Sequence, residues 1–156
     1  MYYGEIKNCD IANGEGIRVS LFVSGCRHRC PGCFNREAWD FNYGAPFTTD
    51  VENDIIAAAK PSYVTGLTLL GGEPFEPENQ APLVSFVKRF REANPNKTVW
   101  CYTGFLFEDI LFNKDRREDC AKSQNEKQIA NIRANDIAER YICVSALEKS
   151  CNRVRC

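Results

Sequence analysis

The sequence lacks any run of 18 apolar residues, the length that suggests a membrane-spanning helix. Its N-terminus also lacks the basic start and the apolar stretch of a secretory signal peptide. Charge of one sign is not in excess, because 20 lysine and arginine residues stand against 21 aspartate and glutamate residues. The chain as a whole is therefore not attracted electrostatically to nucleic acid or to an anionic membrane. We expect a cytoplasmic protein that binds neither.

Histidine is scarce, with one residue, whereas cysteine is abundant, with nine. The odd number of cysteines and the expected reducing compartment disfavour a complete disulfide framework. The chain has 156 residues, of which 44% are hydrophobic, so it is long enough to fold as one domain with a buried core. No internal repeat or low-complexity linker marks a second domain.

Apolar runs that end in loops alternate with segments of helical periodicity. The pattern predicts strands at residues 18–23, 67–70 and 98–102, and helices at residues 49–60, 78–94 and 106–113. This order favours an α/β fold of parallel strands, with functional loops at the C-terminal ends of the strands. Residues 115–140 offer only a thin apolar face, which is typical of a weak helix or a mobile tail, and residues 141–146 could add a strand.

Cys26, Cys30 and Cys33 lie within eight residues, directly after the first predicted strand. Three thiolates on one short loop are typical of metal or iron–sulfur ligation. A structural zinc site usually needs two separated pairs of ligands, and no second pair lies at a familiar distance, although His28 could be a fourth ligand. A [4Fe–4S] cluster held by three cysteines keeps one iron open for a substrate. Zinc binding and three buried cysteines without metal remain the alternatives.

Gly71, Gly72, Glu73 and Pro74 follow the second predicted strand. Two glycines would allow a ligand to approach the backbone, and the Glu73 carboxylate suits a cationic ammonium group. The alternative is a simple Gly-Gly turn that ends a strand. Because both this turn and the cysteine loop leave the C-terminal ends of predicted parallel strands, we expect them to face the same cavity.

These two motifs together resemble the radical S-adenosylmethionine superfamily. More narrowly, the chain resembles the activating proteins of anaerobic (class III) ribonucleoside-triphosphate reductases over residues 1–114. The resemblance is carried by residues 13–18 (NGEGIR), 21–26 (LFVSGC), 32–35 (GCFN), Trp39 and 100–104 (WCYTG). It implies a partial, incomplete parallel β/α barrel whose core is residues 1–114. Residues 115–156 lack the Val-Asp-Gly and Arg-Gly-Ser segments of relatives, so we interpret them as a divergent or truncated C-terminal segment of the same domain.

The resemblance also implies an activity and a set of site residues. In such enzymes a [4Fe–4S] cluster cleaves S-adenosylmethionine reductively, and the resulting 5′-deoxyadenosyl radical takes a hydrogen atom from a glycine of the reductase. By this resemblance the cluster ligands would be Cys26, Cys30 and Cys33. The residues along S-adenosylmethionine would be Gly32, Cys33, Phe34, Gly71, Gly72 and Glu73. Expected partners are the large, glycyl-radical subunit of the reductase and an electron donor such as flavodoxin or ferredoxin.

Three other functions remain open at this point. The chain could activate a different glycyl-radical enzyme, such as pyruvate formate-lyase. It could be a zinc-binding module without catalysis, or an electron-transfer protein that uses a cluster without S-adenosylmethionine.

The resemblance also implies a role for residues 13–18, which would face the substrate glycine. The alternative is that these residues form a plain turn with Arg18 in solvent.

Overall fold

The computed structural model describes residues 1–105. Its strands are β1 (Tyr2–Asp10), β2 (Ile17–Val23), β3 (Ala45–Pro46), β4 (Val64–Gly71) and β5 (Thr98–Cys101). The helices are α1 (Thr49–Ala58) and α2 (Pro77–Ala93), together with a short 3₁₀ helix at Arg36–Trp39. The three strands and two helices predicted within this part of the chain are confirmed. The helix at 106–113, the strand at 141–146 and the segment 115–156 lie outside the described residues.

The five strands form one open sheet in the order β3-β1-β2-β4-β5. β2, β4 and β5 are parallel, as predicted, whereas β1 pairs antiparallel with β2 and with β3. The α/β class is therefore confirmed, and the prediction of a wholly parallel sheet is wrong. β1 gave no clear signal in the sequence because most of its residues are exposed or half-buried and three of them, Glu5, Lys7 and Asp10, are charged.

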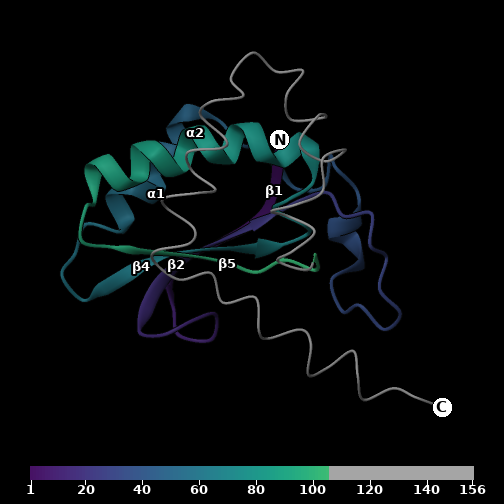
Figure 1. Ribbon diagram of the computed structural model, residues 1–156, viewed down its shortest axis with the longest axis horizontal. Coiled ribbons are helices and arrows are strands. Elements are labelled where there is room, and N and C mark those ends of the chain that lie inside the picture. The colour runs from purple at the N-terminus through teal and green to yellow at the C-terminus, as the bar shows by residue number, and fades with distance from the viewer. Residues whose placement is uncertain (106–156) are drawn as a thin grey trace.

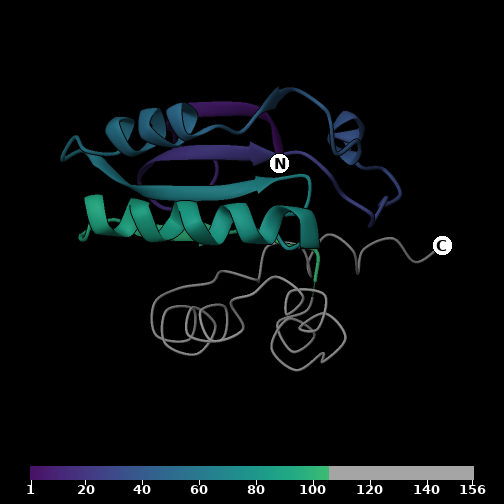
Figure 2. The same cartoon turned by 90° about the horizontal axis from the view of Figure 1, so that it is seen from above.

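Both helices cover the same face of the sheet, as Figures 1 and 2 show. Alternation along β2 sends Val19, Leu21 and Val23 towards these helices, where all three are fully buried. The remaining buried core comes from β4 and the two helices, with Ile55, Ala59, Val64, Leu67, Leu69, Leu83, Phe86 and Phe90. This core fixes β2 and β4 side by side, and so it fixes the two loops that leave their C-terminal ends.

The connection from β1 to β2 lies at the other end of β2 from the cysteine loop. Arg18, at the start of β2, is 1% exposed, so the interpretation of this side chain as solvated is wrong. Its guanidinium donates to Thr68 Oγ1 at 2.6 Å and to the Leu67 carbonyl at 2.7 Å. Burial lowers the pKa of Arg18, but its nitrogen atoms have these polar acceptors in place of water. Arg18 therefore ties β2 to β4.

Asp10, the last residue of β1, is a buried carboxylate. We expect it to make the free energy of unfolding depend on pH in the acid range. Burial acts to raise the pKa of Asp10, but hydrogen bonds from Asn13 (2.6 Å) and the Ala12 N–H (2.9 Å) outweigh it, and the pKa is lowered. The ionised carboxylate therefore stabilises the fold at a pH above the pKa of Asp10 in the unfolded chain, which is near 4. This stabilisation is lost as the pH falls through the lower pKa of Asp10 in the folded chain. Asp10→Asn should cost about 1–2 kcal/mol at pH 7 and reduce the loss of stability below about pH 4. Urea denaturation at both pH values measures this, and equal acid sensitivity in the two proteins would refute it.

In the part of the chain that the structure describes, no helix is both long and apolar enough to cross a membrane.

Candidate metal centre

The cysteine loop and the Gly-Gly turn lie side by side. In the parallel pair of β2 and β4, Val23 is opposite Gly71, so residues 24–33 and residues 72–76 leave the same edge of the sheet. The backbone pairing continues beyond the strands, because the Gly72 N–H donates to the Val23 carbonyl at 2.7 Å and the Glu73 N–H to the Gly25 carbonyl at 2.8 Å. The prediction that both motifs leave one edge of the sheet is therefore confirmed, and that they face the same cavity stays a prediction.

The three clustered cysteines are free thiols with different exposure. Cys26 and Cys33 are half-buried, and Cys30 is exposed. Within residues 1–105, no three side chains of His, Cys, Asp or Glu are gathered closely enough to hold a metal ion. The structure thus brings the three cysteines onto one loop without converging their sulfur atoms. The predicted assignment of ligands among them remains a prediction, and Cys120, Cys143, Cys151 and Cys156 lie outside the described residues.

The surroundings of Cys26 act on the pKa of its thiol in opposite directions. Burial, and then the charges of Glu73 and Glu76, raise the pKa of the Cys26 thiol, whereas hydrogen bonds from the backbone N–H groups of His28 and Arg29 lower it. The net shift is upward, so binding a metal ion here would have to displace a proton. The two N–H donors stabilise negative charge on sulfur once that proton has left. Three free thiols on one loop are the donor type that an iron–sulfur cluster takes, so the donor set fits such a cluster.

A cavity of about 600 Å³ lies between the cysteine loop and the segment that follows it. It is lined by Cys26, Arg27, Arg29, Arg36, Trp39, Asp40, Phe41 and Asn42. The segment closes back on the loop through hydrogen bonds from the Gly25 N–H to the Ala38 carbonyl at 2.8 Å and from the Cys26 N–H to the Trp39 carbonyl at 3.3 Å. Arginine side chains in its lining suit a cluster whose thiolate ligands make it negatively charged.

Gly71 and Gly72 are required for a different reason from the one that the sequence suggested. A Cβ on Gly72 would lie 2.6 Å from the Gly25 carbonyl oxygen and 3.0 Å from that of Ala38. At Gly71 it would lie 2.8 Å from the Cα of Phe22, and φ there is +108°. The space beside both glycines is thus filled by the backbone of this chain. Their lack of a side chain allows the chain segments on either side to pack together. The sequence analysis had interpreted the same glycines as leaving room for a ligand.

Gly32 and Phe34 have the opposite environment. A Cβ added to Gly32 would meet nothing within 4 Å, and φ of this residue is +75°. Phe34 is fully exposed, so the alternative that it is a core aromatic is wrong. Both residues therefore remain free to contact a ligand or a partner protein.

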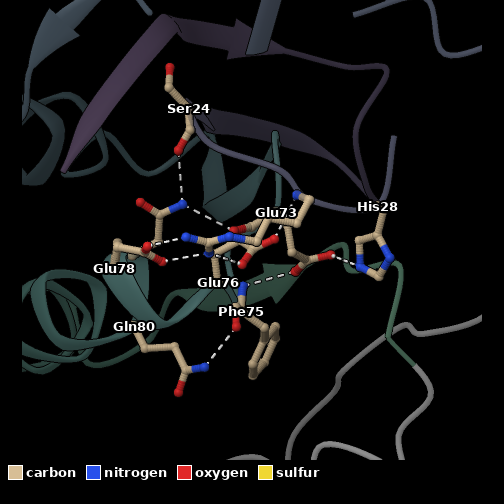
Figure 3. A network of polar contacts seen from close by, with 9 residues as sticks. Ser24, His28, Glu73, Phe75, Glu76, Glu78 and Gln80 are labelled. Carbon is tan, nitrogen blue, oxygen red and sulfur yellow. Dashed lines mark hydrogen bonds and ion pairs between the residues drawn. The ribbon is translucent and has the colours of Figure 1, made fainter. Parts of the chain in front are cut away.

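Glu73, which the sequence analysis paired with an ammonium group, is a buried carboxylate. Its side chain is 2% exposed. Oε1 accepts from the Phe75 N–H at 2.8 Å and from the Thr103 hydroxyl at 2.7 Å. Oε2 accepts from the Gly104 N–H at 2.8 Å and lies 3.3 Å from Nε2 of His28 (Figure 3). Glu73 therefore joins the Gly-Gly turn to the end of β5 and to the cysteine loop.

A second carboxylate, at the N-cap position of α2, also holds the cysteine loop. Glu76 is 3% exposed and accepts from the Arg27 N–H at 2.7 Å and from the Arg27 guanidinium at 2.6 Å. The same guanidinium pairs with Glu78 and lies over the ring of Phe41, 4.4 Å from its centroid. Arg27 therefore fastens the cysteine loop to the beginning of α2.

Sequence reasoning did not assign roles to Glu76 or Thr103, and for Arg27 it predicted only a positive charge beside the cysteines. Thr103 follows the third predicted strand directly, so the rule that placed the two motifs at one sheet edge could have placed it there too. The partners of Arg27 are 49 and 51 residues away in sequence, and no local pattern indicates such contacts.

We expect Gly72→Ala to separate the two loops, because its Cβ would collide with two backbone carbonyl groups. Backbone atoms cannot rotate away as a side chain can, so the substitution should cost about 1–3 kcal/mol and reduce the iron that the chain takes up. Thermal denaturation and iron analysis after anaerobic reconstitution measure both effects. Gly32→Ala is the control, with only a left-handed φ to strain it and a cost of about 1 kcal/mol. Equal effects of the two substitutions would contradict the packing argument.

Comparisons with known proteins agree with this chemistry. Residues 12–132 match the family model described as a 4Fe-4S single cluster domain. The chain is 42% identical, over 110 residues and 70% of each chain, to a protein of Enterobacteria phage T4 named anaerobic ribonucleoside-triphosphate reductase-activating protein. Proteins of the same name match from Pasteurella multocida, at 43% identity over 120 residues and 76% of each chain, and from Escherichia coli K12. The latter is 39% identical over 112 residues, 70% of this chain and 73% of its own.

Proposed function

This chain belongs to the family of anaerobic ribonucleoside-triphosphate reductase-activating proteins, and we propose that it generates a glycyl radical on such a reductase by cleaving S-adenosylmethionine. The main support is the pairing of the three-cysteine loop with the Gly-Gly turn at one edge of the sheet, in a chain that matches a 4Fe-4S single cluster domain. The large reductase subunit is the proposed partner, and flavodoxin or ferredoxin is the proposed type of electron donor.

In this proposal Cys26, Cys30 and Cys33 hold a [4Fe–4S] cluster. When bound, the cluster supplies the electron that cleaves S-adenosylmethionine to methionine and a 5′-deoxyadenosyl radical, which takes a hydrogen atom from the reductase glycine. The N–H groups of His28 and Arg29 stabilise the thiolate of Cys26. Arg27 holds the loop against α2 through the buried Glu76, so the loop is anchored independently of the metal.

S-Adenosylmethionine lies along two segments in this proposal, Gly32, Cys33 and Phe34 on one side and Gly71, Gly72 and Glu73 on the other. Gly32 and Phe34 are accessible to it. The carboxylate of Glu73 is enclosed by its four neighbours, so in this proposal its negative charge attracts the ammonium group of the cofactor from beneath the surface and not by direct contact. We also propose that the open sheet is the described part of a partial β/α barrel of the radical S-adenosylmethionine type, since β2, β4 and β5 are parallel.

The alternatives have less support. The relatives reported above carry the name of the ribonucleotide reductase system, not of pyruvate formate-lyase. The matching family model describes an iron–sulfur domain and not a zinc module. A simple electron carrier would have no evident use for the Gly-Gly turn packed against its cysteine loop.

Anaerobic reconstitution with iron and sulfide tests the proposal. We expect about four irons per chain and, after reduction with dithionite in the presence of S-adenosylmethionine, formation of 5′-deoxyadenosine and methionine. Chromatography measures both products. Stoichiometric zinc in place of iron would contradict the proposal, as would a full cluster without cleavage, which would indicate an electron carrier.

A further inference from the structure

The junction between the two loops contains a buried side-chain amide. Asn79, the third residue of α2, is 1% exposed. Its Nδ2 donates to the Ser24 carbonyl at 2.9 Å and to the Glu73 carbonyl at 3.0 Å. Figure 3 shows Ser24 and Glu73 at the two ends of this connection. One carboxamide thus joins the residue two positions before Cys26 to the third residue of the Gly-Gly-Glu-Pro turn.

Both hydrogens of the Asn79 amide are used in these bonds. Because the amide is buried, water cannot take its place. A side chain without a donor would therefore leave the carbonyl groups of Ser24 and Glu73 without this hydrogen-bond partner. Aspartate has nearly the same shape as asparagine, but when ionised it would place negative oxygen atoms against two carbonyl oxygens. The geometry therefore makes the contact specific for a side chain that donates twice.

The position of α2 does not depend on this amide. Leu83, Phe86 and Phe90 are buried in the core and anchor the helix against the sheet. Loss of the amide should therefore leave the helix in place and act on the spacing between the cysteine loop and the turn.

We propose that Asn79 is a positioning residue that sets the distance between the cysteine loop and the Gly71–Gly72–Glu73 segment, and thereby the affinity for S-adenosylmethionine. The inference rests on the proposed function, in which the cofactor contacts both segments. A ligand that bridges two segments binds more tightly when they are already held in the bound arrangement, since binding does not have to order them. Asn79 does not touch the cofactor in this account, because it is buried and its donors are occupied.

Asn79→Ala tests the inference in the full-length, reconstituted chain. We expect S-adenosylmethionine to bind about tenfold more weakly, which corresponds to about 1.4 kcal/mol, with unchanged iron content. Equilibrium dialysis under anaerobic conditions measures the dissociation constant. Asn79→Asp should weaken binding at least as much, although its shape is conserved. Asn79→Ser, which keeps one donor, should bind with intermediate affinity.

Asn94→Ala is the matched control. Asn94 is also a buried asparagine, but it is the C-cap residue that directly follows α2, and its side-chain amide donates to the Ile56 carbonyl at 3.3 Å. The Asn94→Ala variant should have a lower midpoint of thermal unfolding and an unchanged affinity for S-adenosylmethionine. Equal affinity of wild type and Asn79→Ala would overturn the inference, and so would equal weakening by Asn79→Ala and Asn94→Ala.

Two further outcomes separate the inference from the proposed function. If reconstituted wild type does not bind S-adenosylmethionine at all, the proposed function fails and the inference falls with it. If wild type binds and only the comparison among variants fails, the inference alone is wrong. If Asn79→Ala loses its iron, the affinity of Asn79→Ser for S-adenosylmethionine tests the inference instead. If both variants lose iron in proportion to their loss of thermal stability, a positioning role is contradicted.

Discussion

Replacing Cys30 with alanine is expected to abolish both the iron–sulfur cluster and the cleavage of S-adenosylmethionine. Cys30 is the exposed member of the three cysteines on the loop, so its loss should not disturb the hydrophobic core. In the proposed function it supplies one of three protein ligands, and a cluster held by the two remaining cysteines would be labile. Iron should fall from about four per chain to background, and 5′-deoxyadenosine should become undetectable.

The matched control for this substitution is Cys9→Ala. Cys9 is also an exposed free cysteine, but it lies on β1 outside the cysteine loop. It should retain the iron content and cleavage rate of wild type. If Cys30→Ala kept its cluster and its cleavage activity, Cys30 would not belong to the ligand set, and the assignment of the three-cysteine loop would be wrong.

Glu73→Gln is the second substitution with a large expected effect. The carboxylate accepts from two backbone N–H groups and one hydroxyl and lies beside His28, so every neighbour named above is a donor or can become one. A glutamine must turn its NH₂ group towards one of these sides, where donor would face donor in a buried site. The change also removes the negative charge that attracts the ammonium group of the cofactor.

We expect Glu73→Gln to cost about 2–3 kcal/mol of stability and to lower the rate of S-adenosylmethionine cleavage by about 100-fold. Thermal denaturation and product chromatography measure the two effects. Glu78→Gln is the control, because Glu78 lies in the first turn of α2, five residues after Glu73, but is exposed and pairs with Arg27 on the surface. It should change stability by no more than about 1 kcal/mol. Equal effects of the two substitutions would remove Glu73 from the site.

The sequence was sufficient to place the two motifs, because strand, loop and helix alternate and the C-terminal ends of parallel strands meet at one edge. It was not sufficient to show why the motifs need their residues. Gly72 was interpreted as room for a ligand, whereas the space beside it is filled by the backbone of Gly25 and Ala38. Glu73 was interpreted only as a carboxylate that suits an ammonium group, whereas Thr103 and Gly104 enclose it from 30 and 31 residues further along the chain.

The missed features share a physical cause. β1 is held by backbone pairing with β2 and carries little apolar alternation, so its sequence resembles that of a polar loop. Asn79 reads as an ordinary residue near a helix N-terminus, and one of its two hydrogen bonds is to Ser24, 55 residues away. Arg18 was interpreted as solvated because arginine is usually exposed, and its acceptors on β4 lie 49 and 50 residues away. Contacts between segments distant in sequence decide these three cases.

The most direct test of the account is radical formation on a reductase. A purified anaerobic ribonucleoside-triphosphate reductase is mixed with this chain as the sole activator, together with S-adenosylmethionine and a reductant, and is examined by electron paramagnetic resonance. We predict a glycyl radical signal on the reductase that requires the chain and the cofactor and is absent with Cys30→Ala. A chain that carries a full cluster and cleaves the cofactor, yet produces no radical on any such reductase, would contradict the central claim.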